Sequence, residues 1–240
     1  MFGLMALLPL RHSFIAQQGI SNGKFFFTRS FARLRLRMSQ SNLNICDINS
    51  DLMKASNEQF KIKLREILAS QANEEKQLVL VLVGIPGCGK STFSLRFINE
   101  TKGWARVCQD EMKNRQKTIN AAIRYLEKGP KVVQGLIIDR CNFDAVQRGH
   151  WITLAEERGA VPLCIVLRDA DNVRVCTRRA LERGNDGVHT GKEDWRSIVA
   201  RMGMQFDAPR LEEGFAGIYW CEERSGGSAS TVQALFTARD

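Results

Sequence analysis

A glycine-rich loop constrains the fold of this chain more than any other feature. Residues 78–83, Leu-Val-Leu-Val-Leu-Val, form an uninterrupted apolar run, which is typical of a strand buried on both faces of a parallel sheet. Residues 84–91, Gly-Ile-Pro-Gly-Cys-Gly-Lys-Ser, have the spacing of a phosphate-binding loop. Residues 91–99 carry apolar side chains that a helix can turn back toward the strand. The sequence therefore predicts a strand, a loop and a helix start in the order that such a loop requires.

The loop is expected to bind the phosphates of a nucleotide. Its backbone N–H groups and the positive end of the following helix dipole point at the same place, which suits a polyphosphate. Lys90 is expected to place a positive charge between the outer phosphates, and the Ser91 hydroxyl is expected to bind Mg²⁺. We therefore predict ATP and Mg²⁺ as cofactors. The residues predicted to contact the nucleotide are Gly84, Gly87, Cys88, Gly89, Lys90, Ser91 and Thr92.

Apolar runs and helical segments alternate through the rest of the chain. This alternation predicts an α/β fold, a P-loop NTPase three-layer sandwich with a parallel sheet and helices on both faces. Ligands of such a sheet bind at the carboxyl ends of the strands. Further strands are predicted at 105–108, 132–138, 161–167 and 218–221, and helices at 57–70, 118–128, 144–159, 171–183 and 193–204.

The chain is expected to divide into four segments. Residues 1–45 are predicted to be a presequence or a disordered basic tail, because the first acid comes only at Asp47. Residues 46–76 are expected to be a helical N-terminal extension, and 77–222 the P-loop domain. Residues 223–240 are expected to be a C-terminal tail, since the Arg-Ser-Gly-Gly-Ser run that begins it predicts a loose end. The basic, acid-free start favours an intracellular protein of the nucleus or the mitochondrion.

Composition narrows the class of protein only slightly. The net charge is +9, but six basic residues lie before Cys46, so the remainder carries +9 − 6 = +3, which is weak support for a polyanionic partner. Seven cysteines without a C-x-x-C pair indicate reduced thiols rather than a disulfide scaffold or a zinc site. No apolar run reaches the roughly 18 residues that span a bilayer. We expect a monomer that does not enter the membrane.

Two acids follow predicted strands beside the loop. Asp110 comes after the second strand, where an acceptor would enter, and Asp139 follows an apolar run typical of the acid on the metal side of such enzymes. An acid in either place can hold Mg²⁺ through water or take a proton from an attacking hydroxyl. Each can equally be a helix cap or a solvated acid in a turn.

A pair of arginines precedes a glycine-containing segment that we expect to be flexible. Arg179 and Arg183 lie four residues apart and therefore on one face of a helix. Such a segment can close over a triphosphate and bring guanidinium groups onto the charge that develops during phosphoryl transfer. The alternative is a solvated basic face. His189, within the segment, is expected to be solvated.

Several short motifs together resemble the kinase domain of polynucleotide 5′-hydroxyl kinases. The resemblance covers most of residues 78–215, and its most specific part is the last two motifs. The motifs are the phosphate loop at 84–92, Gln-Asp at 109–110, Ile-Asp-Arg-Cys-Asn at 138–142, Gln-Phe-Asp-Ala-Pro at 205–209 and Glu-Gly-Phe at 213–215.

The resemblance implies roles for individual residues. Asp110 matches the general base of the family, and Asp139 and Asn142 match its pair on the acceptor side. Arg179 and Arg183 resemble its lid arginines.

The chain also departs from the family pattern at two positions. Gln109 stands where the family usually has arginine, and Lys113 stands where the phage enzyme has an arginine that contacts the acceptor phosphate. The Asp-x-Asp-Gly-Thr phosphatase signature is absent from the chain. Any 3′-phosphatase or end-sealing activity would therefore have to come from elsewhere.

The resemblance implies an ATP-dependent kinase that phosphorylates the 5′-hydroxyl ends of DNA or RNA, with repair-complex proteins as possible partners. Two alternatives stay open. One is a kinase of a small-molecule hydroxyl on the same scaffold. The other is a nucleotide-dependent adaptor module with little catalysis, which the lysine at position 113 leaves open.

Overall fold

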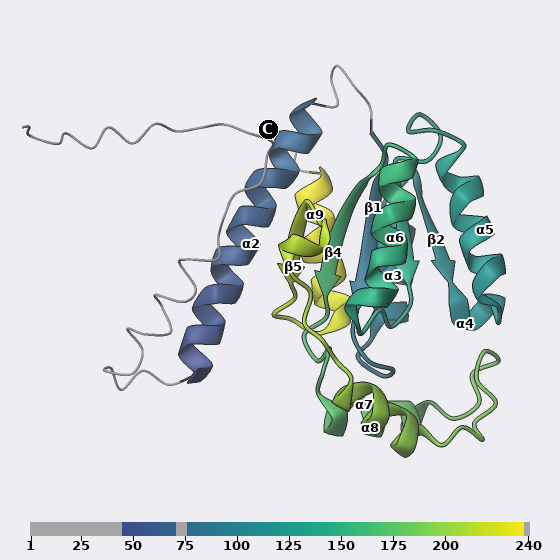
Figure 1. Ribbon diagram of the computed structural model, residues 1–240. Helices are drawn as coiled ribbons and strands as arrows, with labels where there is room; N and C mark the ends of the chain where they lie inside the picture. Colours follow the sequence, from purple (N-terminus) through teal and green to yellow (C-terminus); the bar gives the residue numbers. More distant parts are fainter. Residues whose placement is uncertain (1–44, 71–75, 238–240) are drawn as a thin grey trace, which may run out of the picture. The chain divides into compact units, whose positions relative to one another are not determined.

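The computed structural model describes residues 45–70 and 76–237, and almost all of them belong to one compact unit, Cys46–Asp240 (Figure 1). The predicted presequence or tail lies outside the described residues except for Ile45. No helix in the described part of the chain has the length and apolar character needed to cross a membrane.

The centre of the fold is a sheet of five parallel strands in the order β2-β3-β1-β4-β5. The apolar run after residue 77 forms β1 and is buried along its whole length. The chain crosses from one side of β1 to the other between β3 and β4, so the carboxyl end of β1 is the switch point where α/β proteins bind ligands. The strands are β1 (Leu78–Val83), β2 (Trp104–Cys108), β3 (Gly135–Asp139), β4 (Val161–Val166) and β5 (Gly217–Trp220).

Helices cover both faces of this sheet, which confirms the predicted three-layer sandwich. The leucines of β1 face one core cluster and its valines face a second, as the alternation of side chains along a strand requires. The first cluster contains side chains of α3 and α9, and the second contains side chains of α5 and α6. The helices are α2 (Ile45–Ser70), α3 (Lys90–Glu100), α4 (Gln109–Met112), α5 (Arg115–Leu126), α6 (Ala145–Glu157), α7 (Val173–Arg183), α8 (Trp195–Met204), η2 (Leu211–Glu213) and α9 (Ser225–Thr237).

The N-terminal helix α2 covers the outer edge of the sheet. Its Asn57 side chain donates a hydrogen bond to the carbonyl of Trp220 at 2.9 Å and accepts one from the N–H of Trp220 at 2.7 Å. These two bonds occupy backbone groups that an edge strand would otherwise leave unpaired. Phe60 is almost fully buried, whereas Ile62, two residues further on, is exposed. The helix is therefore longer than predicted and is packed against the sheet rather than merely preceding it.

The prediction of a loose C-terminal tail is wrong. Residues 225–237 form α9, in which Ala229 and Val232 are fully buried. Phe236 packs edge-to-face against Trp104 with ring centroids 5.2 Å apart. Glycine and serine have weak helix propensity, but packing against α3 overrides that local preference.

The third strand also begins later than predicted. Residues 129–133 form a turn in which the N–H of Val133 donates to the carbonyl of Gly129 at 2.9 Å. Val132 is consequently exposed, and β3 starts at Gly135.

Candidate nucleotide and acceptor site

The phosphate loop lies between β1 and α3 and depends on its glycines. Gly87 and Gly89 have φ angles of 89° and 103°, in the left-handed region that favours glycine. A Cβ atom on Gly87 would lie 2.2 Å from the carbonyl oxygen of Cys176, and one on Gly89 would lie 1.9 Å from the Ser225 hydroxyl. The loop is therefore held against α7 on one side and α9 on the other, with no room for side chains at these two positions.

Lys90 is the first residue of α3 and is only 8% exposed. Its Nζ donates hydrogen bonds to the carbonyls of Gly84 at 2.9 Å and Ile85 at 3.0 Å, and it lies 3.5 Å from the Cys88 sulfur. Burial alone would lower the pKa of Lys90, but Cys141, Cys88 and Asp139 outweigh it and raise the pKa above its ordinary value. The loop thus holds a permanent positive charge, as a phosphate site requires.

Ser91 and Thr92 lie exposed on the first turn of α3, at the positive end of its dipole. Behind them the buried Asp139 accepts hydrogen bonds on Oδ2 from Ser94 at 2.8 Å and from Arg106 at 2.6 Å. Mg²⁺ in such sites is bound by one or two side-chain oxygens together with phosphate oxygens and water. The Ser91 hydroxyl and the Asp139 carboxylate supply oxygen ligands of that kind, so the residues present fit the ion.

The structure corrects the prediction for Asn142. Its side chain is fully buried, donates to the carbonyl of Leu82 at 2.8 Å, and accepts from the Trp151 indole at 3.1 Å. Both ends of the amide are bonded inside the protein, so Asn142 does not present a group to an acceptor. It ties the loop after β3 to β1 and α6.

Asp139 is also less available to an acceptor than predicted. Its ion pair with Arg106 lies inside the protein, and Arg106 donates a further bond to Glu111 at 2.7 Å. Arg106 therefore compensates the negative charge of Asp139, the last residue of β3. The position fits the metal-side alternative for Asp139 better than direct contact with the acceptor.

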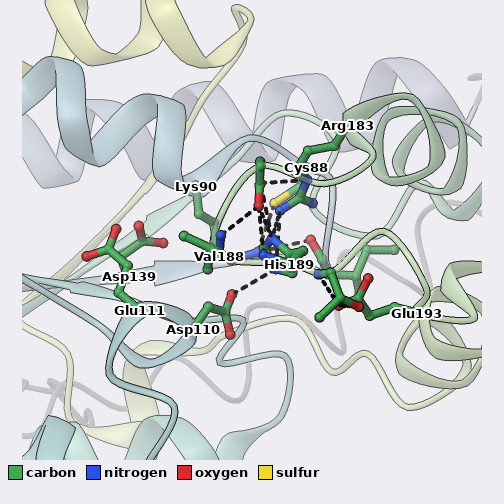
Figure 2. Close-up of polar contacts among 12 residues, drawn as sticks. Cys88, Lys90, Asp110, Glu111, Asp139, Arg183, Val188, His189 and Glu193 are labelled. Carbon is green, nitrogen blue, oxygen red and sulfur yellow. Dashed lines mark hydrogen bonds and ion pairs between the residues drawn. The ribbon is translucent and has the colours of Figure 1, made fainter.

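Asp110 lies on α4, a helix of four residues that begins where β2 ends. Its side chain is 61% exposed, and its Oδ2 lies 3.9 Å from Nε2 of His189 (Figure 2). Lys113 is exposed at the C-terminal cap of the same helix, with φ at 52°. The carboxylate predicted to be the general base is therefore open to an incoming group, while contact of Lys113 with an acceptor stays a prediction.

The two lid arginines belong to α7 but point to different partners. Arg179 forms an ion pair with Asp169 at 2.8 Å. Arg183 lies over the ring of Trp195, with its guanidinium carbon 5.3 Å from the centroid, and its NH1 lies 3.1 Å from Nδ1 of His189. Of the two arginines, Arg183 is the one that the structure connects to the acceptor side.

The segment between α7 and α8 was expected to be flexible, with a solvated His189. The structure shows hydrogen-bonded turns in this segment and a His189 ring that is mostly buried. Asp186 accepts hydrogen bonds from the N–H groups of Val188 at 3.1 Å and His189 at 2.7 Å. The pKa of Asp186 is lowered to about 2, and the hydrogen bond from the backbone N–H of His189 makes the largest contribution. The His189 ring is 14% exposed and packs edge-on against Trp195. The Asn-Asp-Gly run at 185–187 is a turn signal that could have predicted this order.

Arg148, a buried arginine that the sequence analysis did not single out, supports the loop after β3. Arg148 is fully buried and forms two hydrogen bonds of 2.7 Å with the Glu213 carboxylate. Its NH1 donates to the carbonyls of Asp207 at 2.8 Å and Asn142 at 3.2 Å. The most specific motifs of the family resemblance, at 205–209 and 213–215, therefore have a structural use: they hold the loop after β3 in place.

The fold and the phosphate loop define the P-loop class of nucleotide-binding proteins, and the loop itself is anchored to both halves of the sheet. The N–H of Gly84 donates to the carbonyl of Cys141 at 2.9 Å, and that of Ile85 to the carbonyl of Ala170 at 2.7 Å. The sequence profile of a family described as an AAA domain matches residues 79–209, more than half of the chain. The chain belongs to this AAA domain family.

Sequence relatives confirm the predicted resemblance to polynucleotide kinases. The chain is 34% identical over 148 residues to a bifunctional polynucleotide phosphatase/kinase of Schizosaccharomyces pombe, covering 60% of this chain and 33% of that protein. It is 32% identical over 158 residues to transcription factor bHLH140 of Arabidopsis thaliana, covering 63% of this chain and 16% of that protein. The chain thus spans a third or less of the length of these curated relatives.

A solved structure has the same fold. The crystal structure of a fungal RNA kinase superposes with a TM-score of 0.56 at 13% identity, covering 65% of this chain and 84% of the other. Identity at this level supports the shared architecture alone.

Proposed function

We propose that this protein transfers the γ-phosphate of ATP to the 5′-hydroxyl end of DNA or RNA. The observation that carries the proposal is an accessible carboxylate, Asp110, at the same edge of the sheet as a phosphate loop with a buried, charged Lys90. The similarity to a polynucleotide phosphatase/kinase over this region supports the choice of acceptor. A role at broken or processed nucleic-acid ends follows from that chemistry.

The nucleotide would be held by the loop on the side of β1. The loop N–H groups and Lys90 bind the outer phosphates, where their charge is fixed before the reaction begins. The Ser91 hydroxyl would bind Mg²⁺, with Asp139 behind it. When bound, the ion neutralises charge on the phosphate oxygens and orients them.

The acceptor would enter from the exposed side of Asp110. The carboxylate accepts the proton of the 5′-hydroxyl as the hydroxyl oxygen bonds to the γ-phosphorus and the bond to the β-phosphate oxygen breaks. Arg183, the last residue of α7, contacts His189, and its guanidinium would stabilise the charge that develops on the transferred group. ADP and a 5′-phosphate end are the products.

A labelling assay tests the proposal. We expect γ-labelled ATP to label DNA or RNA oligonucleotides that carry a 5′-hydroxyl, and not the same oligonucleotides with a 5′-phosphate. Label that enters nucleosides or sugars and no oligonucleotide would contradict the proposal and favour the small-molecule alternative. Tight ATP binding without any labelled product would contradict it too and favour an adaptor.

A further inference from the structure

His189 connects two parts of the site that lie far apart in the sequence. Its Nδ1 lies 3.1 Å from NH1 of Arg183, on the lid side, and its Nε2 lies 3.9 Å from Oδ2 of Asp110, on the acceptor side. Asp186 lies 3.1 Å from Nδ1 and holds the ring from the third direction. Figure 2 shows the imidazole between Arg183 and Asp110.

The chemistry of the ring limits how it can face Asp110. Nδ1 cannot accept a hydrogen bond from Arg183 and donate one to Asp186 at the same time. In the neutral ring that accepts from Arg183, the proton is on Nε2; in the charged ring that donates to Asp186, both nitrogens carry protons. Both of these states direct an Nε2–H toward the carboxylate of Asp110. The neutral ring with its proton on Nδ1 would donate to Asp186 and leave Nε2 as an acceptor, 3.4 Å from NH1 of Arg183, so the proposal depends on one of the first two states. A separation of 3.9 Å exceeds a direct hydrogen bond and can be bridged by water or shortened when substrate binds.

We propose that His189 is a positioning residue that orients the Asp110 carboxylate only when residues 184–194, the lid segment between α7 and α8, are closed over the site. Asp110 stands on a short helix and is largely exposed, so it can rotate freely without such a partner. A donor at Oδ2 leaves Oδ1 to face the acceptor hydroxyl. Because the same ring touches Arg183, the base is aligned in the same arrangement that brings the lid arginine over the site. The inference rests on the proposed function of Asp110.

Two simpler roles for His189 give different expectations. A proton relay through the ring is not needed, because an exposed carboxylate can pass its proton to water. A purely structural role, through the edge contact with Trp195 at 5.1 Å, would leave the effect of His189 independent of Asp110. The positioning role and the purely structural role are distinguished by whether the effect of a substitution at His189 depends on the presence of the Asp110 carboxylate.

The first test combines substitutions in the full chain. We expect His189→Ala to lower kcat for a 5′-hydroxyl oligonucleotide by about 10-fold with little change in the KM for ATP, and to change the residual rate of Asp110→Ala by less than about 2-fold. His150→Ala, which changes an exposed histidine of α6, should leave kcat unchanged. A 10-fold loss in both backgrounds would show that the contact with Asp110 is irrelevant and would overturn the proposal.

Two conservative variants sharpen the test. The side-chain amide of glutamine presents its N–H near the place of Nε2, whereas that of asparagine presents it near the place of Nδ1. We expect His189→Gln to keep about half of kcat, and His189→Asn to fall as far as His189→Ala. Equal losses for glutamine and asparagine would contradict a role for Nε2.

A second measurement needs no substrate and therefore stands apart from the proposed function. Coupling between two sites is reciprocal, so Asp110 should hold the lid as much as the lid holds Asp110. We expect Asp110→Ala and His189→Ala each to speed tryptic cleavage at the exposed Lys192, and the double variant to add nothing further. Parental cleavage in Asp110→Ala beside faster cleavage in His189→Ala would overturn the proposal. If no oligonucleotide is phosphorylated, the proposed function fails while this coupling can still be observed.

Discussion

The two sides of the site are built in opposite ways. On the phosphate side, Lys90 is 8% exposed and its loop is fixed by close contacts with the backbone of Cys176 and the side chain of Ser225. On the acceptor side, Asp110 is 61% exposed and stands on a helix of four residues. A nucleotide presents the same phosphates every time, so a rigid preformed site suits it, whereas the end of a polymer needs an open approach. Under the proposed function, the difference assigns nucleotide binding to the rigid side and alignment of the acceptor to the open side.

The largest expected effect tests the buried ion pair that holds the loop after β3, between the two sides. Arg148→Ala should lower the free energy of unfolding by about 3–5 kcal/mol, because the Glu213 carboxylate then loses its buried partner. Urea denaturation measures this change. Arg158→Ala removes an ion pair between partly exposed side chains and should cost less than about 1 kcal/mol. Similar losses in both variants would mean that the buried pair holds the loop after β3 no more firmly than a surface pair would.

The next expected effect removes the fixed charge of the phosphate side. Lys90→Ala should reduce turnover by about 10³-fold and weaken ATP binding, because the loop then lacks its ammonium group. Calorimetric titration with ATP and the labelling assay measure both quantities. Lys102→Ala, which changes an exposed lysine just beyond α3, serves as the control. Unchanged ATP affinity in Lys90→Ala would show that this side does not hold the phosphates.

A third substitution tests the acceptor side alone. Asp110→Ala should reduce phosphoryl transfer by about 10²-fold and leave ATP affinity unchanged, since the role proposed for this exposed carboxylate is to accept the proton of the acceptor and not to bind the nucleotide. Asp171→Ala, at an exposed position before α7, should have no effect on either quantity. If Asp110→Ala lost ATP binding along with transfer, the proposed division of the site would be wrong.

The smallest expected effect lies outside both sides. Asn57→Ala should lower the free energy of unfolding by about 1–2 kcal/mol, because it leaves the N–H and carbonyl of Trp220 without their partner. Turnover of the folded enzyme should not change. Gln59→Ala changes an exposed residue two positions further along α2 and should be neutral. A loss of activity without a loss of stability would extend the site to this edge of the sheet.

Local sequence signals predicted the parts of the fold that depend on neighbours in the chain. The buried run of β1 and the phosphate loop both follow from short patterns. Helix α9 did not, because its glycines and serines disfavour a helix until α3 packs against it. The glycines and serines at 225–228 therefore predict a loose segment, whereas the structure has a helix there.

The site followed the same division. Sequence placed Lys90 and Asp110 by their motifs, and the structure brings each to the carboxyl edge of the sheet. It could not show that Asn142 spends both ends of its amide inside the protein. It also could not show that Arg106 of the neighbouring strand pairs with Asp139. Arg106 lies 33 positions before Asp139 and meets it through the register of β2 against β3.

The contact between Ser225 and the phosphate loop joins residues that are 137 positions apart. Since the Ser225 hydroxyl lies where a Cβ on Gly89 would be, the start of α9 forms one wall of the nucleotide loop. Anything that pulls α9 away from α3, whether a bound protein or a fused tag at the carboxyl terminus, would alter the loop without entering the site. A change in the position of α9 would therefore be expected to alter nucleotide binding.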